Sequence, residues 1–129
     1  MAGKIIADQI EHSTAGTVDT QYVVNGSAKA WVNFTGITTT ASRDSFNVSS
    51  LTDDTTGSTS ITFSNNMSNA NFTGSWFTNA STGSGSGNFG NDYGGGFAAR
   101  TTSSYKVVAY SSDVIDSFYN DSIIFGDLA

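Results

Sequence analysis

The sequence predicts an all-β protein, an antiparallel β-sandwich of jelly-roll-like type, and three observations lead to this prediction. Short runs of alternating apolar and polar residues recur along the chain, and no stretch shows a convincing helical period. The runs are spaced by roughly 8–14 residues, which favours antiparallel sheets over strands joined by crossover helices. Charged residues make up only 12% of the 129 residues, and the Ser, Thr, Asn and Gly that replace them disfavour helices.

Seven strands are expected in order along the chain. The first covers residues 20–24 and is followed by an Asn-Gly pair, which is typical of tight turns. The second covers residues 28–34 and places Ala30, Val32 and Phe34 on one face, because side chains alternate along a strand. Further strands are expected at residues 44–49, 59–64, 71–77, 105–110 and 122–125, with a turn at 53–57.

The beginning of the chain differs from the rest. Its apolar side chains include Ile5, Ile6 and Ile10, which suit either one turn of amphipathic helix or an extended arm. We therefore divide the chain into an N-terminal arm, residues 1–17, and a β-sandwich domain, residues 18–129. The arm lacks the sustained apolar region of a signal peptide, and no stretch approaches the ~20 apolar residues of a membrane-spanning helix.

The chain contains no proline, although proline is one device that protects the edge strands of β-sheets. With few charges and no proline, the edges need another form of protection. A neighbouring subunit would provide it, so we expect a homo-oligomer.

The charge balance argues against some classes of partner. Eleven acidic residues face five Lys or Arg, for a net charge of −6. Nucleic-acid binding requires clustered cations, and the five cations here are scattered along the chain. The net negative charge also disfavours binding to an anionic membrane surface, because like charges repel. The absence of cysteine excludes disulfides and thiolate metal sites.

The segment 81–97, STGSGSGNFGNDYGGGF, contains half of the chain's 14 glycines. It includes the spacing Gly85-x-Gly87-x-x-Gly90, which in dinucleotide-binding proteins lies between a strand and a helix. No helical pattern follows here, and too little chain remains for a second domain that a linker would join. We expect a long exposed loop, a type of segment that is often functional.

Aromatic side chains in and near this segment are candidates for contact with a receptor or another surface. Aromatic rings among Gly, Ser and Asn are typical of binding loops, and they stack on sugar rings, so a host glycan is a candidate ligand. The alternative is that the rings pack back onto the sandwich or across a subunit interface. The candidate contact residues are Trp76, Phe77, Phe89, Asn91, Asp92, Tyr93 and Phe97.

Catalytic and metal-binding patterns are weak. Glu11, His12 and Ser13 have the residue types of a hydrolase triad, but adjacent residues do not converge as a triad requires. The adjacent Asp53 and Asp54 suit a turn better than an acid–base pair. A third set, Asp113, Asp116 and Asp121, has hard-cation ligands without a calcium-loop pattern. We therefore expect no catalytic residues, no cofactor and no metal.

Several blocks of the sequence resemble a known family. These are TVDTQYVVNGSAKAWVNF at 17–34, RDSFNVSSLTD at 43–53, SITFS at 60–64, MSNAN at 67–71 and DSIIFG at 121–126. They are similar to segments of tail-fibre-like virion structural proteins of cyanophages and other marine bacteriophages. The resemblance covers roughly residues 17–80 and the last ten, and residues 81–104 do not share it.

The resemblance implies a non-enzymatic virion protein, assembled as a β-rich homotrimer in the bacterial host cytoplasm before it joins the particle. Long fibres of this kind carry a shaft or anchor before the matching module, whereas only about sixteen residues precede it here. The expectation is a short fibre or knob whose arm, with Ile5, Ile6 and Ile10, docks to other virion proteins, and whose loops contact the host surface. The alternative is a capsid decoration or cement protein. A glycan-degrading tailspike is disfavoured, since it would need a longer chain and placed acidic residues.

Overall fold

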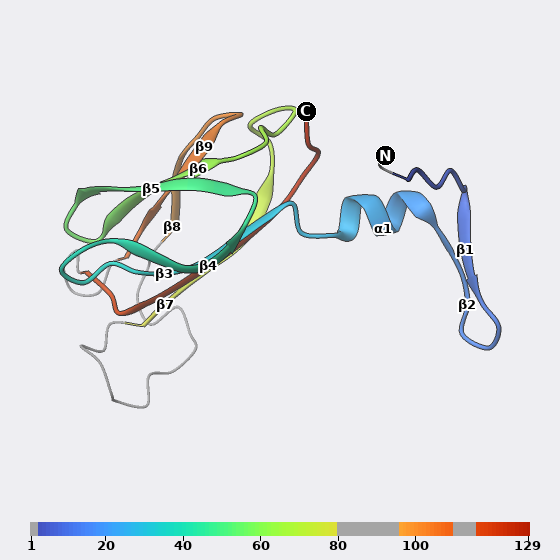
Figure 1. The fold of residues 1–129 in the computed structure, drawn as a ribbon, viewed down its shortest axis with the longest axis horizontal. Coiled ribbons are helices and arrows are strands. Elements are labelled where there is room, and N and C mark those ends of the chain that lie inside the picture. The colour runs from blue at the N-terminus through green and yellow to red at the C-terminus, as the bar shows by residue number, and fades with distance from the viewer. Residues whose placement is uncertain (1–2, 80–95, 110–115) are drawn as a thin grey trace.

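The computed structural model describes residues 3–79, 96–109 and 116–129, and within these residues the protein consists of β-strands and one short helix (Figure 1). All strand pairs are antiparallel, so the predicted all-β class is confirmed. The elements are β1 (Gln9–His12), β2 (Gly16–Asp19), α1 (Thr20–Gly26), β3 (Ala30–Thr35), β4 (Ala41–Phe46), β5 (Val48–Thr55), β6 (Ser58–Phe63), β7 (Thr73–Asn79), β8 (Gly96–Arg100), β9 (Ser104–Val108) and β10 (Tyr119–Phe125).

Eight of these strands form two four-stranded sheets. The first sheet has the order β4-β3-β10-β7 and the second has the order β5-β6-β9-β8, while β1 and β2 form a separate hairpin. The chain passes repeatedly between the two sheets, so strands distant in sequence become neighbours. For example, β10 pairs with β3 on one side and β7 on the other.

Side chains from both sheets form one hydrophobic core. In β3 the residues alternate between buried and half-buried, and Ala30, Val32 and Phe34 are the buried ones, as the sequence predicts. Phe34 stacks on Trp76 of β7 with ring centroids 5.8 Å apart. The ring of Tyr105, on the second sheet, lies 5.3 Å from that of Phe63. Each such large side chain contributes roughly 1.5–3 kcal/mol when it is fully buried.

The expected single strand at 44–49 is divided at Asn47, which is a correction to the prediction. Asn47 has a φ of 55°, a left-handed conformation that asparagine adopts more readily than most residues. Its side-chain amide donates to the carbonyl oxygens of Lys29 (3.0 Å) and Asn65 (3.1 Å), and its Oδ1 accepts from the Asn65 N–H (2.7 Å). These bonds hold a corner at which the chain leaves the first sheet and enters the second.

The prediction of a strand at residues 20–24 is also wrong, because this segment forms α1. The hairpin strand β2 ends at Asp19, and its partner β1 begins at Gln9, so the following residues have no strand beside them in the described structure. A helix satisfies backbone groups within the segment itself. The Asn-Gly pair that suggested a hairpin turn lies at the end of this helix.

The loop predicted at residues 81–97 overlaps the start of a strand at its C-terminal end. Gly96 and Phe97 begin β8, in which Phe97 pairs with Val107 of β9. Residues 81–95 of the predicted loop lie outside the described residues. Strand β8 escaped prediction because its sequence, GFAAR, has no clear alternation of apolar and polar residues.

Candidate functional site

The most unusual part of the described structure is the N-terminal arm, which we define from its packing as residues 3–27. It consists of β1, β2 and α1 and extends away from the two sheets (Figure 1). None of its residues is buried, whereas Lys29 and Ala30, which follow it, are. The boundary expected after residue 17 falls inside β2, so packing places the start of the β-domain later.

Local hydrogen bonds hold the hairpin of the arm together. The Gln9 amide donates to Asp19 Oδ1 at 2.8 Å, and the Thr20 hydroxyl donates to the Ala7 carbonyl oxygen at 2.7 Å. At the turn, His12 Nδ1 accepts the N–H of Ala15 at 3.1 Å, and Gly16 adopts a φ of 95°, which glycine tolerates best. This arrangement gives His12 a part in forming the turn.

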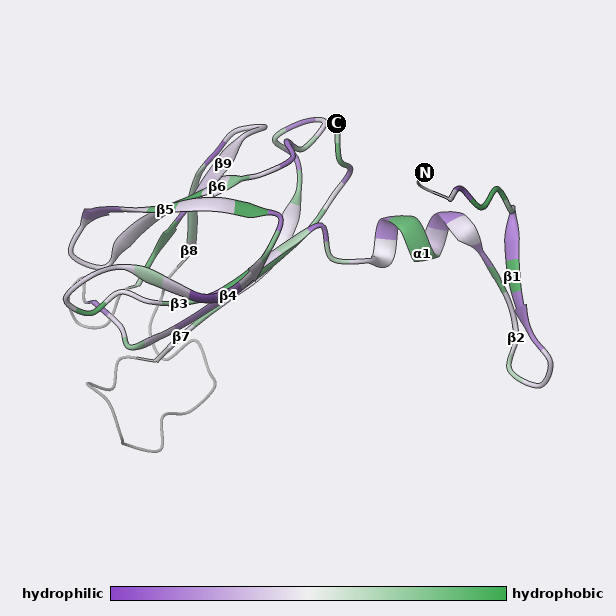
Figure 2. Ribbon diagram, viewed as in Figure 1, coloured by the Kyte–Doolittle hydropathy of each residue, from purple (hydrophilic) through white to green (hydrophobic). Residues whose placement is uncertain are grey.

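Apolar residues lie along the arm (Figure 2), and their side chains are exposed to an extent that the fold of the arm does not explain. Ile5 is 94% exposed, Ile6 82%, Tyr22 65%, Val24 57% and Ile10 51%. Helix α1 has only seven residues and no buried side chain, and an isolated helix of that length is marginal in water. Exposed contiguous apolar side chains are a feature that interaction surfaces share.

Lys29 fastens the arm to the β-domain. Its ammonium group donates to the carbonyl oxygens of Val24 and Ser27 and to the Ser27 hydroxyl (2.7 Å), and its side chain is only 8% exposed. Val24 lies in the last turn of α1, where carbonyl oxygens lack helical partners and a cation is favourable. The Lys29 N–H donates to the Ile124 carbonyl oxygen at 2.8 Å, so the residue joins the helix end to β10.

Sequence reasoning missed both the hairpin and Lys29. The Ala15-Gly16 pair between Ile10 and Val18 was a signal for a turn. No comparable signal existed for Lys29, since its burial depends on α1, and that segment was expected to be a strand.

The predicted contact residues are not brought together. Trp76 and Phe77 are neighbours on β7 and therefore point to opposite faces: Trp76 is 6% exposed, in the core, and Phe77 is 42% exposed. Phe97 packs on the core, with its ring 5.6 Å from that of Tyr105. Trp76 is thus corrected from a surface to a core position, and Phe97 is half-buried against the core, because both side chains point inward. The remaining candidates, Phe89, Asn91, Asp92 and Tyr93, lie outside the described residues.

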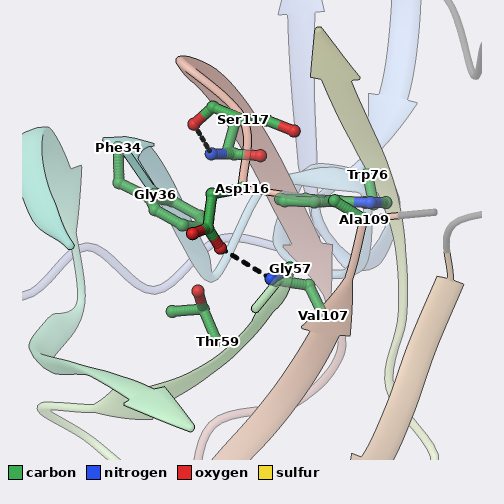
Figure 3. Close-up of a pocket in the computed structure, with 10 residues that line it drawn as sticks. Phe34, Gly36, Gly57, Thr59, Trp76, Val107, Ala109, Asp116 and Ser117 are labelled. Atoms are coloured by element: carbon green, nitrogen blue, oxygen red, sulfur yellow. Dashed lines mark hydrogen bonds between the residues drawn. The ribbon is translucent and has the colours of Figure 1, made fainter. Parts of the chain in front are cut away.

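A small cavity lies between the sheets near Trp76 (Figure 3). Its volume of about 10 Å³ suits roughly one water molecule. The indole N–H of Trp76 is buried without a hydrogen-bond partner among the described residues. Asp116, at the rim, accepts the Gly57 N–H at 2.7 Å, so its carboxylate braces the backbone. A cavity of this size does not admit a substrate.

Polar side chains beside this cavity satisfy one another. The one hydroxyl hydrogen of Thr78 is shared between Ser117 Oγ at 2.7 Å and Asn120 Oδ1 at 3.0 Å. The Asn120 amide donates to the Ser117 carbonyl oxygen at 2.9 Å. Thr78, Ser117 and Asn120 are all buried. Buried polar groups are normally paired in this way, so the network is adequately explained by folding.

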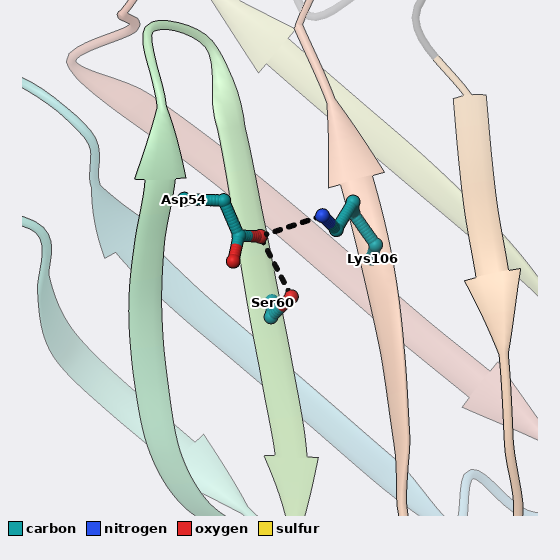
Figure 4. Close-up of polar contacts among 3 residues, drawn as sticks. All are labelled: Asp54, Ser60 and Lys106. Atoms are coloured by element: carbon teal, nitrogen blue, oxygen red, sulfur yellow. Dashed lines mark hydrogen bonds and ion pairs between the residues drawn. The ribbon is translucent and has the colours of Figure 1, made fainter.

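The carboxylates that suggested acid–base or metal chemistry are dispersed. Asp54 accepts the Ser60 hydroxyl at 2.7 Å and lies 3.1 Å from Lys106 Nζ (Figure 4). The Ser60 hydrogen bond, and then Lys106, lower the pKa of the Asp54 carboxyl below its ordinary value. Asp121 accepts the Asn33 amide, and Asp113 lies outside the described residues. In the ranges 3–79, 96–109 and 116–129, no three His, Cys, Asp or Glu side chains are grouped to hold a metal ion.

Comparisons with protein-family models, with curated proteins and with solved structures found no match to this chain. Among the described residues, α1 is the only helix, and it is too short to cross a membrane.

Proposed function

We propose that the protein is a non-enzymatic structural component of a bacteriophage particle. In this proposal the arm of residues 3–27 binds another virion protein, and the β-domain projects from the particle as a short fibre or knob. The β-domain is a jelly-roll-like β-sandwich, and three copies associate. The phage context comes from the resemblance of residues 17–80 and of the last ten residues to tail-fibre-like proteins.

The observation that carries the proposal is the arm, which has no buried residue and exposes Ile5 and Ile6 almost completely. Apolar side chains on an extended segment gain free energy only when a partner covers them, about 25 cal/mol per Å² of apolar surface. An arm whose apolar side chains are not buried within its own protein can bury them against a partner, as attachment to a larger assembly requires. The pair at positions 5 and 6 is the strongest candidate contact.

A second observation favours a structural role over catalysis. The side chains with the residue types of catalysis have local partners: His12 holds its turn, and Asp54 is paired with Ser60 and Lys106. The cavity near Trp76 has room for roughly one water molecule. These placements support a structural protein that functions by binding other proteins at its surface.

The other candidate function is capsid decoration, in which the β-domain caps the shell and stabilises it. The same arm supports this function, since a cement protein also needs an apolar attachment segment. The two functions differ in location on the particle and in consequence. Loss of a decoration protein lowers the temperature at which particles release their genome, whereas loss of a tail fibre lowers adsorption to the host.

Contact with a host surface glycan remains part of the fibre proposal through the segment 81–97, of which residues 81–95 lie outside the described residues. Deletion of residues 83–95 should reduce adsorption and leave incorporation into particles unchanged. Unchanged adsorption would remove the receptor contact from the proposal and leave the structural role intact. Membrane insertion and nucleic-acid binding are not part of the proposed function.

The arm is tested by a double substitution, Ile5→Asp with Ile6→Asp, followed by measurement of the protein's copy number in purified phage particles. We expect incorporation to fall by at least about tenfold, since burying two carboxylates in an apolar contact costs several kcal/mol. Ser50→Asp, at an exposed position of β5, controls for added negative charge. Normal incorporation of the double variant would show that the arm is not the attachment segment.

A further inference from the structure

The outer face of the first sheet is unusually apolar. On this sheet the side chains that point away from the core include large apolar groups from all four strands. Three of them are about half exposed: Phe46 at 52%, Tyr119 at 45% and Phe77 at 42%. Trp31, Ile123 and Phe125 alternate with buried neighbours and are half-buried on the same face.

The register of the strands sets three of these groups side by side. Trp31 of β3 lies directly opposite Phe46 of β4 on one side and opposite Ile123 of β10 on the other. Phe77 of β7 is opposite Asp121 of β10. Directly opposed side chains lie about 4.5–5.5 Å apart at Cβ, so Phe46, Trp31 and Ile123 form a continuous apolar row across three strands.

The outer face of the second sheet provides an internal comparison. Its outward side chains are mainly hydroxyls, such as Thr52, Thr62 and Ser104, together with the Asp54–Lys106 ion pair. This is the polar composition that a sheet shows where it faces water. The first sheet departs from that pattern, and an apolar face of this kind on one of two sheets indicates a surface that a partner covers.

The charges on the apolar face are of both signs. The Arg43 guanidinium lies 4.7 Å from the ring centroids of Phe118 and Tyr119 and donates to Asn33 Oδ1 at 3.3 Å. Among the described residues no carboxylate pairs with it, since the ion pair found there joins Lys106 and Asp54. The carboxylates of Asp44 and Asp121 lie on the same face, where the register sets them on either side of Asn33. A face that carries unpaired charge of both signs complements a copy of itself.

We propose that the outer face of the first sheet, built on Phe46, Trp31 and Ile123, is the surface on which a second copy of this chain packs. This inference rests on the proposed function in that it names a contact between copies of this chain. Because the same face serves both copies, the contact joins them in twofold pairs and is distinct from the contacts that hold three copies together. The facing copies exclude water from the apolar row, and Arg43 of one copy is free to pair with a carboxylate of the other.

The size of the face sets the strength of the contact. Four strands spaced by about 4.8 Å and six or seven residues long give a face of roughly 20 by 20 Å. A pair of such faces buries less than the ~1,200 Å² typical of stable complexes. The isolated protein should therefore associate weakly, in a concentration-dependent manner, and neighbours on the particle would strengthen the contact by proximity.

The test is sedimentation velocity of the full chain from about 5 to about 500 µM. The sedimentation coefficient of the unmodified chain should rise with concentration. Phe46→Thr combined with Ile123→Thr places threonine, which favours strands, at both positions and should weaken association at least about tenfold. Ala98→Thr with Val108→Thr, on the outer side of the second sheet, is the matched control and should associate like the unmodified chain. Circular dichroism and thermal unfolding confirm that each variant is folded.

Three outcomes would overturn the inference. One is an unmodified chain that stays monomeric throughout the concentration range, and another is a Phe46→Thr, Ile123→Thr variant that associates normally. The third is loss of association in the Ile5→Asp, Ile6→Asp variant alone, which would assign the contact to the arm. None of these outcomes bears on whether the protein is found on the particle, so the inference and the proposed function can fail separately.

Discussion

The hydroxyl of Tyr105 on β9 lies 2.6 Å from Oγ of Ser122 on β10, and this hydrogen bond joins the two sheets inside the core. Tyr105 is 1% exposed and Ser122 is 4% exposed. A polar contact at this depth is strong when it is complete and costly when one partner is removed. It therefore fixes how the second sheet sits on the first.

Tyr105→Phe should destabilise the protein by about 1–3 kcal/mol, because it leaves the Ser122 hydroxyl buried without its partner. Urea unfolding measures the change. Ser122→Ala should cost a similar amount, and the double variant should cost less than the sum of the two, because both changes remove the same bond. Strictly additive losses would show that the two hydroxyls do not interact.

Stability should fall at alkaline pH through the same residue. Burial raises the pKa of Tyr105 from 10.0 to about 12, with a smaller opposing effect of the Ser122 hydrogen bond. Because the folded-state pKa lies above that of the unfolded chain, the stabilisation is complete below about pH 10 and is lost as the pH rises towards 12. Unfolding free energies measured between these pH values should decline less in Tyr105→Phe. An identical decline in both proteins would contradict the assignment.

Gly74→Ala should disrupt the junction of β7 and β10. A Cβ at position 74 would clash with the Ile123 carbonyl oxygen and lie 2.7 Å from Ile124 Cδ1. Backbone has little room to move here, so we expect a loss of at least about 1–3 kcal/mol, the range for an overfilled core. Gly3→Ala, which meets no atom within 4 Å, is the control and should melt like the unmodified chain. Equal melting temperatures for both variants would show that the sheet yields at this point.

Lys29→Met should loosen the arm while the β-domain stays folded. It removes three hydrogen bonds that tie the end of α1 to the domain but keeps an apolar stem of similar length. Chymotrypsin should then cleave after Tyr22, which is 65% exposed, several-fold faster, since proteolysis follows local opening. Lys106→Met is the control. An unchanged cleavage rate would mean that Lys29 does not restrain the arm.

The sequence predicted the all-β class and the strands β3, β6, β7, β9 and β10, because their apolar residues alternate. In β3, for example, Ala30, Val32 and Phe34 are buried. It did not predict α1, because the valines of that segment favour strands. Among the described residues no strand pairs with the segment, and this permits a helix. The apolar outer face could not be predicted from the sequence. Alternation shows that Trp31 and Ile123 face away from the core, but it does not show that they are neighbours on β3 and β10. Register, which creates that row, depends on contacts distant in sequence.

The attachment of the protein to a phage particle through its arm is tested most directly by electron microscopy of purified particles, comparing the unmodified chain with the Ile5→Asp, Ile6→Asp variant. We predict density for the β-domain on particles that carry the unmodified chain, and its loss from particles that carry the variant, with the Ser50→Asp control retained. Absence of the unmodified chain from the particle, or full retention of the variant, would contradict the account.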